Sequence, residues 1–294
     1  MKRHKWKIVI IIVFIIGFFL MLYPDFSNYW NSKNLSTVVR SYHESMESFS
    51  EEDYEKEFGA AEAYNEDLRN INFPFRNYDL VEGYEDILDI SETGIMGYLT
   101  IDKINVELPI YHGTSEGVLQ IGVGHLQGSS LPTGGIGNHT VLSAHNGLAD
   151  AELFTNLDQM EKGDTFTVTV LDRKLTYQVD QIVVVEPQEF SELAIDEEKD
   201  YCTLLTCTPF GVNSHRLLVR GVRVDDTDMG IFADGKLLDS NMVFLVMFVS
   251  ISVLALLIFF GWRFFHNKRN LAISSLKDRI RNGNIANEKE KDRK

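Results

Sequence analysis

Two cysteines are the side chains of this 294-residue chain best suited to covalent chemistry. Cys202 and Cys207 lie five residues apart in a segment whose composition is typical of a strand. Side chains alternate faces along a strand, so this odd separation puts the two thiols on opposite faces and disfavours a disulfide between them. Two interpretations remain: both are small buried hydrophobic residues, or one of them is a nucleophile.

A cysteine nucleophile needs a base, and His145 is the best-placed histidine. It follows the apolar run 140–144 and precedes the turn pair Asn146-Gly147, and functional groups often lie where a strand ends in a loop. The charged form of His215 is disfavoured by its neighbour Arg216. The central region contains five candidates: His112, His125, His139, His145 and His215.

Arg216 follows Cys207 by nine residues, and turn-forming residues lie between them. Two neighbouring strands joined by that loop would bring Arg216 close to Cys207. A guanidinium is always charged and presents several donors, so it can hold a substrate carbonyl or an oxyanion. The alternative is a solvated arginine at the edge of a strand.

These side chains must be positioned by a β-rich domain that begins near residue 97. Short strand-like runs separated by glycine and proline predict an all-β barrel or sandwich. Helical interludes are expected at 117–126 and 151–160. The expected strands cover 97–101, 106–111, 140–144, 165–171, 175–185, 201–206 and 217–224.

Apolar runs at 8–22 and 242–260 flank the central region and predict two membrane-spanning helices. The first run also fits a cleaved signal peptide, but bulky residues follow it, which favours an anchor. Residues 36–70 predict one or two amphipathic helices. The expected organisation is a cytoplasmic start (1–7), a membrane helix (8–24), an extracellular helical extension with a lid (25–96), the catalytic barrel (97–225), a linker (226–241), a second membrane helix (242–260) and a basic cytoplasmic tail (261–294).

Charge predicts the orientation in the membrane. Of the 28 basic and 43 acidic residues, 14 basic and 4 acidic lie outside the two apolar runs, which leaves 14 against 39 between them and a net charge there of about −25. The positive-inside rule therefore places both ends in the cytoplasm and the central domain outside the cell. A domain with this much negative charge would be repelled by nucleic-acid phosphates, which argues against a nucleic-acid partner.

No cofactor motif stands out in the sequence. Histidines, cysteines and carboxylates do not show zinc-ligand spacing, and there is no glycine-rich phosphate loop. The run 131–135 reads Leu-Pro-Thr-Gly-Gly, which resembles a peptide sorting signal but lacks the residue between proline and threonine. Its position within the domain predicts a turn rather than a self-cleavage site.

These residues together resemble the sortases of Gram-positive bacteria over about 97–224. The signature Thr-Leu-x-Thr-Cys followed nine residues later by arginine is met by 203–207 and Arg216, and the histidine element is met by 144–147. The stretches 104–114, 122–126 and 206–211 are similar to class C, the pilin polymerases. The second apolar helix and the helical extension also resemble that class.

One departure concerns the lid that usually covers the site of class C enzymes with an Asp-Pro-aromatic motif. Its counterpart here is Phe73-Pro74-Phe75, which keeps the proline and the aromatic ring but lacks the acid. A salt-bridged lid is therefore in doubt. Phe75 is still expected to plug the cleft by packing near Cys207.

The resemblance implies an eight-stranded β-barrel and a cysteine transpeptidase that needs no cofactor. The Cys207 thiolate would attack the Thr–Gly peptide of a Leu-Pro-x-Thr-Gly-like signal, His145 would act as general acid and base, and Arg216 would steady the carbonyl and the oxyanion. The acyl group would pass from the thioacyl-enzyme to a pilin lysine. The alternatives are a housekeeping sortase that uses a cell-wall precursor, and an inactive barrel that serves as a scaffold or adhesin.

Overall fold

The computed structural model describes residues 2–46, 49–90, 94–148 and 151–224, together with positions 248, 249, 252 and 263. The chain divides into two compact units, Met1–Ile231 and Phe232–Lys294. All but these four positions of the second unit lie outside the described residues, as does the linker at 226–241. The expected helix at 242–260 and the basic tail therefore belong almost entirely to the part that is not described.

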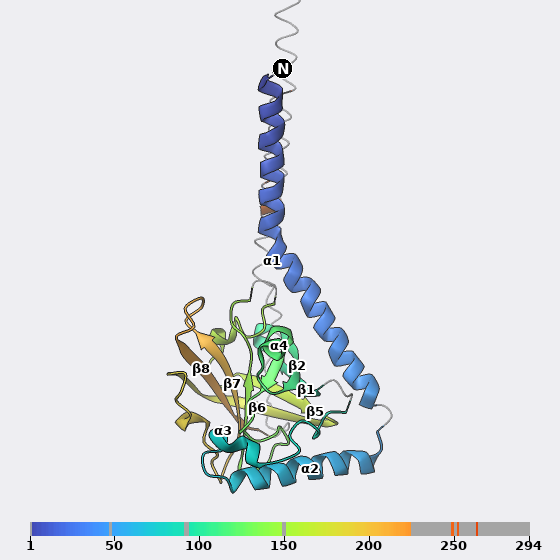
Figure 1. Ribbon diagram of the computed structural model, residues 1–294, viewed down its shortest axis with the longest axis vertical. Coiled ribbons are helices and arrows are strands. Elements are labelled where there is room, and N and C mark those ends of the chain that lie inside the picture. Colours follow the sequence, from blue (N-terminus) through green and yellow to red (C-terminus); the bar gives the residue numbers. More distant parts are fainter. Residues whose placement is uncertain are drawn as a thin grey trace, which may run out of the picture. The chain divides into compact units, whose positions relative to one another are not determined.

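The centre of the first unit is a closed barrel of eight strands (Figure 1). Its strand order is β1-β2-β3-β4-β7-β8-β6-β5, with parallel pairs at β2/β3 and β4/β7 and antiparallel pairs elsewhere. This confirms the all-β prediction and selects the barrel. The strands are β1 (Ile95–Ile101), β2 (Val106–His112), β3 (Val123–His125), β4 (Asn138–Ser143), β5 (Thr165–Val170), β6 (Arg173–Val185), β7 (Asp200–Thr208) and β8 (His215–Arg223).

Alternation of side chains divides the barrel wall into two faces. Leu99, Ile110 and Leu204 are fully buried in the central core, where Phe166 and Tyr177 stack with their ring centres 5.7 Å apart. A second, smaller apolar cluster consists of Val141, Leu193 and Leu218, and we call it the outer cluster. Partly buried residues such as Phe75 and Leu205 pack against the outer cluster.

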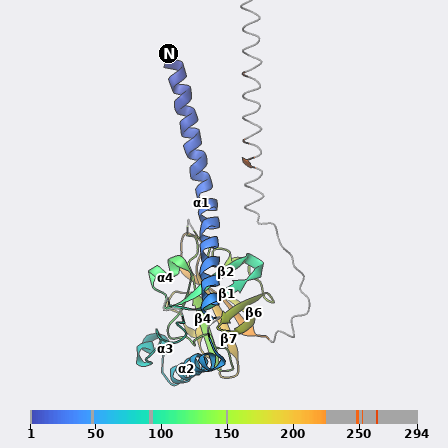
Figure 2. The same ribbon diagram turned by 90° about the vertical axis from the view of Figure 1, so that its right-hand side faces the viewer.

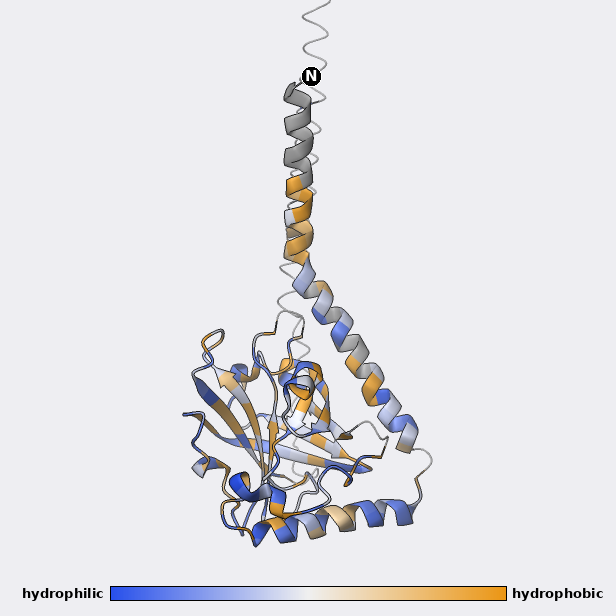
Figure 3. Ribbon diagram, viewed as in Figure 1, coloured by the Kyte–Doolittle hydropathy of each residue, from blue (hydrophilic) through white to orange (hydrophobic). Residues whose placement is uncertain are grey.

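Among the described residues, three α-helices precede the barrel: α1 (Lys2–Met46), α2 (Glu51–Arg69) and α3 (Pro74–Asn77). A band of apolar residues in α1 includes the exposed side chains Val13, Phe14 and Leu20 (Figure 3). A search of the described residues finds no helix with the length and hydropathy needed to cross a membrane. Tyr42 attaches the end of α1 to the barrel, because its hydroxyl donates to Met96 O (3.1 Å) and accepts from Leu171 N–H (2.9 Å).

The helix α2 lies along one end of the barrel (Figures 1 and 2). It begins at a capping box, in which Ser50 and Asp53 satisfy each other's backbone N–H groups. Near its other end Asn65 bonds Leu131 O and Thr133 Oγ1, each at 3.1 Å, and accepts from Leu131 N–H. Leu131, Pro132 and Thr133 of the Leu-Pro-Thr-Gly-Gly segment are therefore buried against α2, whereas Gly135 is exposed.

Two helical expectations within the barrel domain need correction. The interlude at 117–126 is the short helix α4 (Glu116–Ile121) followed by strand β3, which the sequence prediction missed. Over 151–160 the structure has turns and one 3₁₀ turn, and Leu153 adopts a left-handed backbone (φ 38°). Tertiary packing overrides helix propensity there, because Phe154 and Leu157 are fully buried in the core.

The 3₁₀ turns among the described residues are η1 (Tyr78–Leu80), η2 (Asp102–Ile104), η3 (Leu157–Gln159) and η4 (Ser191–Leu193).

Candidate active site

Cys207 and Arg216 lie directly opposite each other on β7 and β8. The antiparallel register pairs Cys207 with Arg216 and Thr208 with His215. The two residues stand near the ends of their strands, where the loop 209–214 joins them. This is the arrangement expected from the spacing of nine residues.

His145 reaches Cys207 through the parallel pairing of β4 with β7. The last paired residues are Ser143 and Leu205. His145 lies two residues beyond the end of β4, and Cys207 lies two residues further along β7. The extended pairing continues past β4, since Ala144 N–H donates to Leu205 O (3.2 Å) and Thr206 Oγ1 donates to Ala144 O (2.8 Å). Side chains in register on parallel strands share a face, so His145 and Cys207 face the same side of the barrel wall.

The loop that carries His145 is fixed on both sides. Asn146 Nδ2 donates to Cys207 O (2.8 Å), which ties the loop to the end of β7. On its other side, Phe154 N–H donates to His145 O (3.1 Å) and Gly147 N–H to Thr155 Oγ1 (3.0 Å). Asn146 is a contributor to the site that sequence reasoning treated only as part of a turn pair.

A groove of about 370 Å³ brings the three predicted residues together. Its walls combine Cys207, His145 and Arg216 with apolar side chains from β6, the segment 187–193 and the loop after β3. A cysteine beside a histidine, with a guanidinium on the opposite strand, is able to form a covalent acyl intermediate and hold its oxyanion. The other lining residues are Thr114, Leu119, Leu126, Ser143, Ala144, Val185, Pro187, Glu189, Phe190, Leu193, Leu205 and Leu218.

A larger cavity, of about 610 Å³, is lined by Gly134, Arg173 and Asp200 among others. It contains neither cysteine and none of the three predicted residues. The smaller groove is therefore the candidate site, because Cys207 lines it.

The guanidinium of Arg216 is oriented by main-chain oxygens. Its Nη1 donates to His215 O (3.0 Å) and Asn213 O (3.3 Å). Among the described residues it has no ion-pair partner within 4 Å.

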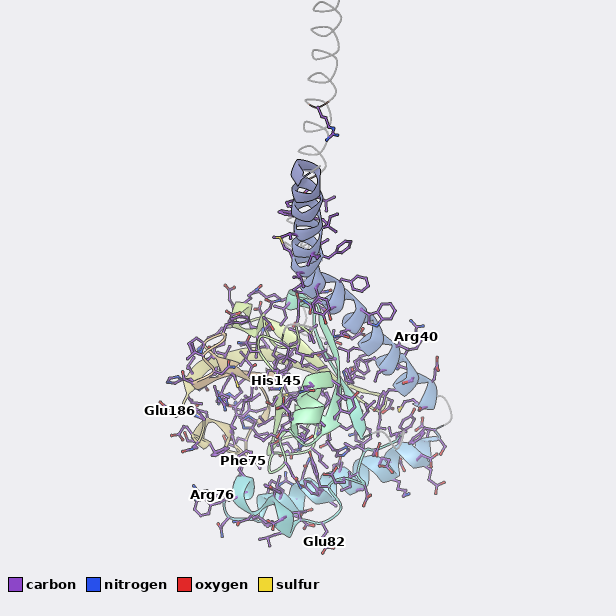
Figure 4. The ribbon with its side chains drawn as sticks, turned by 45° about the horizontal axis from the view of Figure 1, so that its top comes forward. Arg40, Phe75, Arg76, Glu82, His145 and Glu186 are labelled. Carbon is purple, nitrogen blue, oxygen red and sulfur yellow. The ribbon has the colours of Figure 1, made fainter. Side chains whose placement is uncertain are left out.

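The expected lid segment lies next to the groove rather than in its wall. Phe75 stacks on Phe190 with ring centres 5.2 Å apart and packs against the outer cluster, whereas Phe73 is 74% exposed. Pro74 is the first residue of α3, whose backbone passes so close to Gly128 that a Cβ there would lie 2.9 Å from Phe75 Cα. Figure 4 labels Phe75 on this segment and His145 beside α4. Phe75 reaches the groove through Phe190, a partner that the sequence prediction missed.

The other four candidate histidines lie close to polar partners. His125 is fully buried between Tyr84 Oη and Ser130 O, and burial lowers its pKa to about 4. His139 bonds Ala194 O and Thr203 Oγ1, and burial lowers its pKa to about 4 as well. His112 bonds the carbonyls of Ile87 and Gly94, and His215 lies 3.3 Å from Glu186.

Cys202 lies on the opposite face from Cys207, as strand parity predicts. Both thiols are free, and Cys202 is completely buried in the central core. Burial raises the pKa of the Cys202 thiol well above its ordinary range, which suppresses the reactive thiolate. Cys207 is the cysteine that lines the groove.

Comparisons with known proteins agree on one family. A sortase domain model matches residues 99–224. Sortase D of Bacillus subtilis is 34% identical over 137 residues, which cover 45% of this chain and 66% of that protein. The crystal structure of Streptococcus pneumoniae sortase C is 46% identical, with a TM-score of 0.59 and coverage of 64% of this chain and 97% of that one.

A third similar protein is Clostridium perfringens sortase C, whose X-ray structure includes the C-terminal cell wall sorting motif. It is 43% identical, with a TM-score of 0.57, over 65% of this chain and 99% of that chain. The closed eight-stranded barrel and the groove with its cysteine agree with these matches. The chain therefore belongs to the sortase family of cysteine transpeptidases, and within that family to the class C sortases.

Proposed function

We propose that this protein polymerises pilin subunits. Cys207 attacks the threonine carbonyl of a Leu-Pro-x-Thr-Gly-like signal, and the acyl group passes to a lysine of the next subunit. The observation that carries the proposal is the groove in which Cys207, His145 and Arg216 meet. Its apolar lining suits the leucine and proline of such a signal.

In the first half-reaction the thiolate of Cys207 adds to the Thr–Gly carbonyl and Arg216 holds the oxyanion. The C–N bond breaks as His145 protonates the leaving glycine amine. This leaves a thioacyl-enzyme. In the second half-reaction a primary amine adds to the thioester, His145 accepts its proton, and the C–S bond breaks to restore Cys207.

The relatives support the pilin as substrate. The work on Streptococcus pneumoniae sortase C concerns pilin substrate specificity, and Clostridium perfringens sortase C was solved with a cell wall sorting motif. At more than 40% identity over nearly the whole of those chains, the same substrate class is the best candidate for this protein.

We also propose that the barrel works outside the cell, anchored in the lipid bilayer by 8–24 and 242–260 with both termini in the cytoplasm. The proposal rests on the two apolar runs and the basic residues beyond them. A protease that is added to intact cells should cleave the acidic central domain and leave a tag at either terminus untouched. Cleavage of a terminal tag would contradict this topology.

The function is tested with the full-length protein in detergent and a purified pilin that ends in a sorting signal. We expect a ladder of covalent pilin multimers, which Cys207→Ala abolishes while far-UV circular dichroism stays unchanged. The matched control is Cys202→Ala, which should keep the ladder and lower the free energy of unfolding by about 1 kcal/mol. A ladder made by Cys207→Ala would refute Cys207 as the nucleophile.

If the wild-type protein makes no ladder but joins the signal peptide to a cell-wall precursor amine, it is a wall-anchoring sortase. If neither acceptor is used and Cys207 forms no thioacyl adduct with the signal peptide, the barrel is an inactive scaffold. Intact-protein mass spectrometry of the quenched reaction distinguishes these results.

A further inference from the structure

The acceptor amine arrives at the site as a cation. A lysine ammonium has an ordinary pKa of about 10.4, so nearly all of it is protonated at neutral pH. The groove lining contains one guanidinium, that of Arg216, which has no described ion-pair partner, and one carboxylate, that of Glu189. A carboxylate that lies close to the base would favour the approach of this cation.

We propose that Glu116 is this carboxylate and binds the ammonium of the acceptor beside His145. The inference rests on the proposed amine transfer and adds a specificity determinant to it. Glu116 is the first residue of α4, and its Oε1 lies 3.4 Å from His145 Nε2. Glu116 is 72% exposed and the His145 side chain is 25% exposed, so the carboxylate is open to an acceptor that comes from solvent.

Glu116 and His145 lie close together without a hydrogen bond between them. His145 Nε2 is buried and makes no hydrogen bond with the described residues, because its approach to Glu116 lacks hydrogen-bond geometry. Two atoms 3.4 Å apart can both lie within about 2.9 Å of one ammonium nitrogen. Gln120 Nε2 donates to the same Glu116 Oε1 (3.1 Å) and steadies the carboxylate on α4.

Two other carboxylates near the groove have partners of their own. Glu186 lies 3.3 Å from His215 Nε2. Glu189 accepts from Ser191 N–H (3.1 Å), and hydrogen bonds from Ser191 lower its pKa. Neither contacts His145 within 4 Å, whereas Glu116 does. Among the described carboxylates, Glu116 is therefore the one placed to bind an ammonium next to His145.

The chemical step balances without any further reactant. The bound ammonium gives one proton through His145 to solvent and becomes a free amine. The amine adds to the thioacyl carbon, and the tetrahedral nitrogen loses a second proton as the C–S bond breaks. That proton ends on the sulfur of Cys207, and the new C–N bond is the isopeptide bond.

The test compares two small nucleophiles in one assay with full-length protein and a signal peptide. One is a lysine peptide, which is cationic at neutral pH, and the other is hydroxylamine, which is neutral there. For each variant we measure kcat/KM for both nucleophiles and take the ratio of lysine to hydroxylamine. Glu116→Gln should lower this ratio about fivefold, the size expected for one exposed ion pair. Glu116→Asp should restore part of it.

Glu82→Gln is the matched control, because it removes one charge from an exposed glutamate that has no part in the groove. It should leave the ratio unchanged. If Glu116→Gln lowers both rates equally, Glu116 acts only by orienting His145 and the inference is overturned. An unchanged ratio, or a wild-type protein that uses hydroxylamine but no cationic amine, overturns it too.

A wild-type protein that uses the lysine peptide but makes no pilin ladder would refute pilin polymerisation alone. The charge-selective effect of Glu116→Gln would then still support recognition of a primary ammonium. The failure of the proposed function and the failure of this inference therefore give different results.

Discussion

Cys207 and Arg216 are paired across β7 and β8, so the thiol and the guanidinium are held by the hydrogen-bonded ladder of the barrel itself. The nine-residue spacing follows from this geometry, because a loop of fixed length must turn the chain between two paired positions. An active site on rigid strands loses little freedom when substrate binds.

Replacement of Arg216 by lysine tests whether the planar fork of donors is needed. Lysine keeps the charge but not the geometry, so Arg216→Lys should lower kcat about a hundredfold, as does the loss of one oxyanion donor. Among the described residues the Arg216 side chain bonds only the carbonyls of Asn213 and His215, which are its near neighbours in the chain, so the free energy of unfolding should change by less than about 1 kcal/mol. Steady-state kinetics with a signal peptide and urea unfolding measure the two effects.

The matched control for this substitution is Arg220→Lys on the same strand. Arg220 donates twice to Asp180 (2.7 and 3.1 Å) and lies over the Tyr201 ring, so its replacement should lower stability more than activity. If Arg216→Lys retains full kcat, Arg216 does not stabilise the oxyanion through its fork.

Asn146 is expected to be a positioning residue for His145. Asn146→Ala removes the bond to Cys207 O and frees one side of the histidine loop. We expect kcat/KM for the signal peptide to fall about tenfold, because a small misplacement of a base is costly. Thr155→Val removes the bond on the other side of the loop and should have a similar effect. Activity unchanged in both variants would show that the loop needs neither bond.

The stack of Phe75 on Phe190 is expected to restrict the access of reagents to the Cys207 thiol. Phe75→Ala removes the stack and should speed the modification of Cys207 by a thiol reagent several-fold. Phe190→Ala breaks the same contact from the groove side and should act in the same direction, whereas the exposed Phe73→Ala should not. Rates are followed by mass spectrometry of the intact protein. Equal rates in wild type and Phe75→Ala would mean that this segment does not cover the groove.

Two buried histidines predict how stability depends on pH. Burial lowers the pKa of His125 and His139 to about 4, below the ordinary value of about 6.5 in the unfolded chain. Between these values the unfolded chain binds more protons, so the free energy of unfolding falls as pH drops from about 6.5 to about 4. Each histidine contributes at most about 3 kcal/mol to this loss.

Urea unfolding at several pH values checks this prediction. His139→Gln should reduce the decline over that range, even if it lowers stability at neutral pH by removing the bonds to Ala194 and Thr203. A slope equal to that of the wild type would show that His139 does not titrate on unfolding.

Local sequence was enough to predict most strands and the types of residue in the site. Seven of the eight strands follow from short apolar runs between turns, and β3 was missed because three residues carry too little periodicity. The odd spacing of Cys202 and Cys207 predicted opposite faces, since alternation along a strand is a local property. The position of Arg216 opposite Cys207 could also be predicted locally, because a single short loop joins the two residues.

The tertiary structure decided how the predicted His145 is brought to Cys207 and which further groups join the two residues. His145 lies 62 residues from Cys207 in the chain and meets it through the parallel register of β4 and β7, which no local pattern encodes. Asn146, Phe190 and Glu116 join the site through contacts between loops and a short helix. The helix expected at 151–160 does not form, because the burial of Phe154 and Leu157 in the core outweighs the local helix propensity.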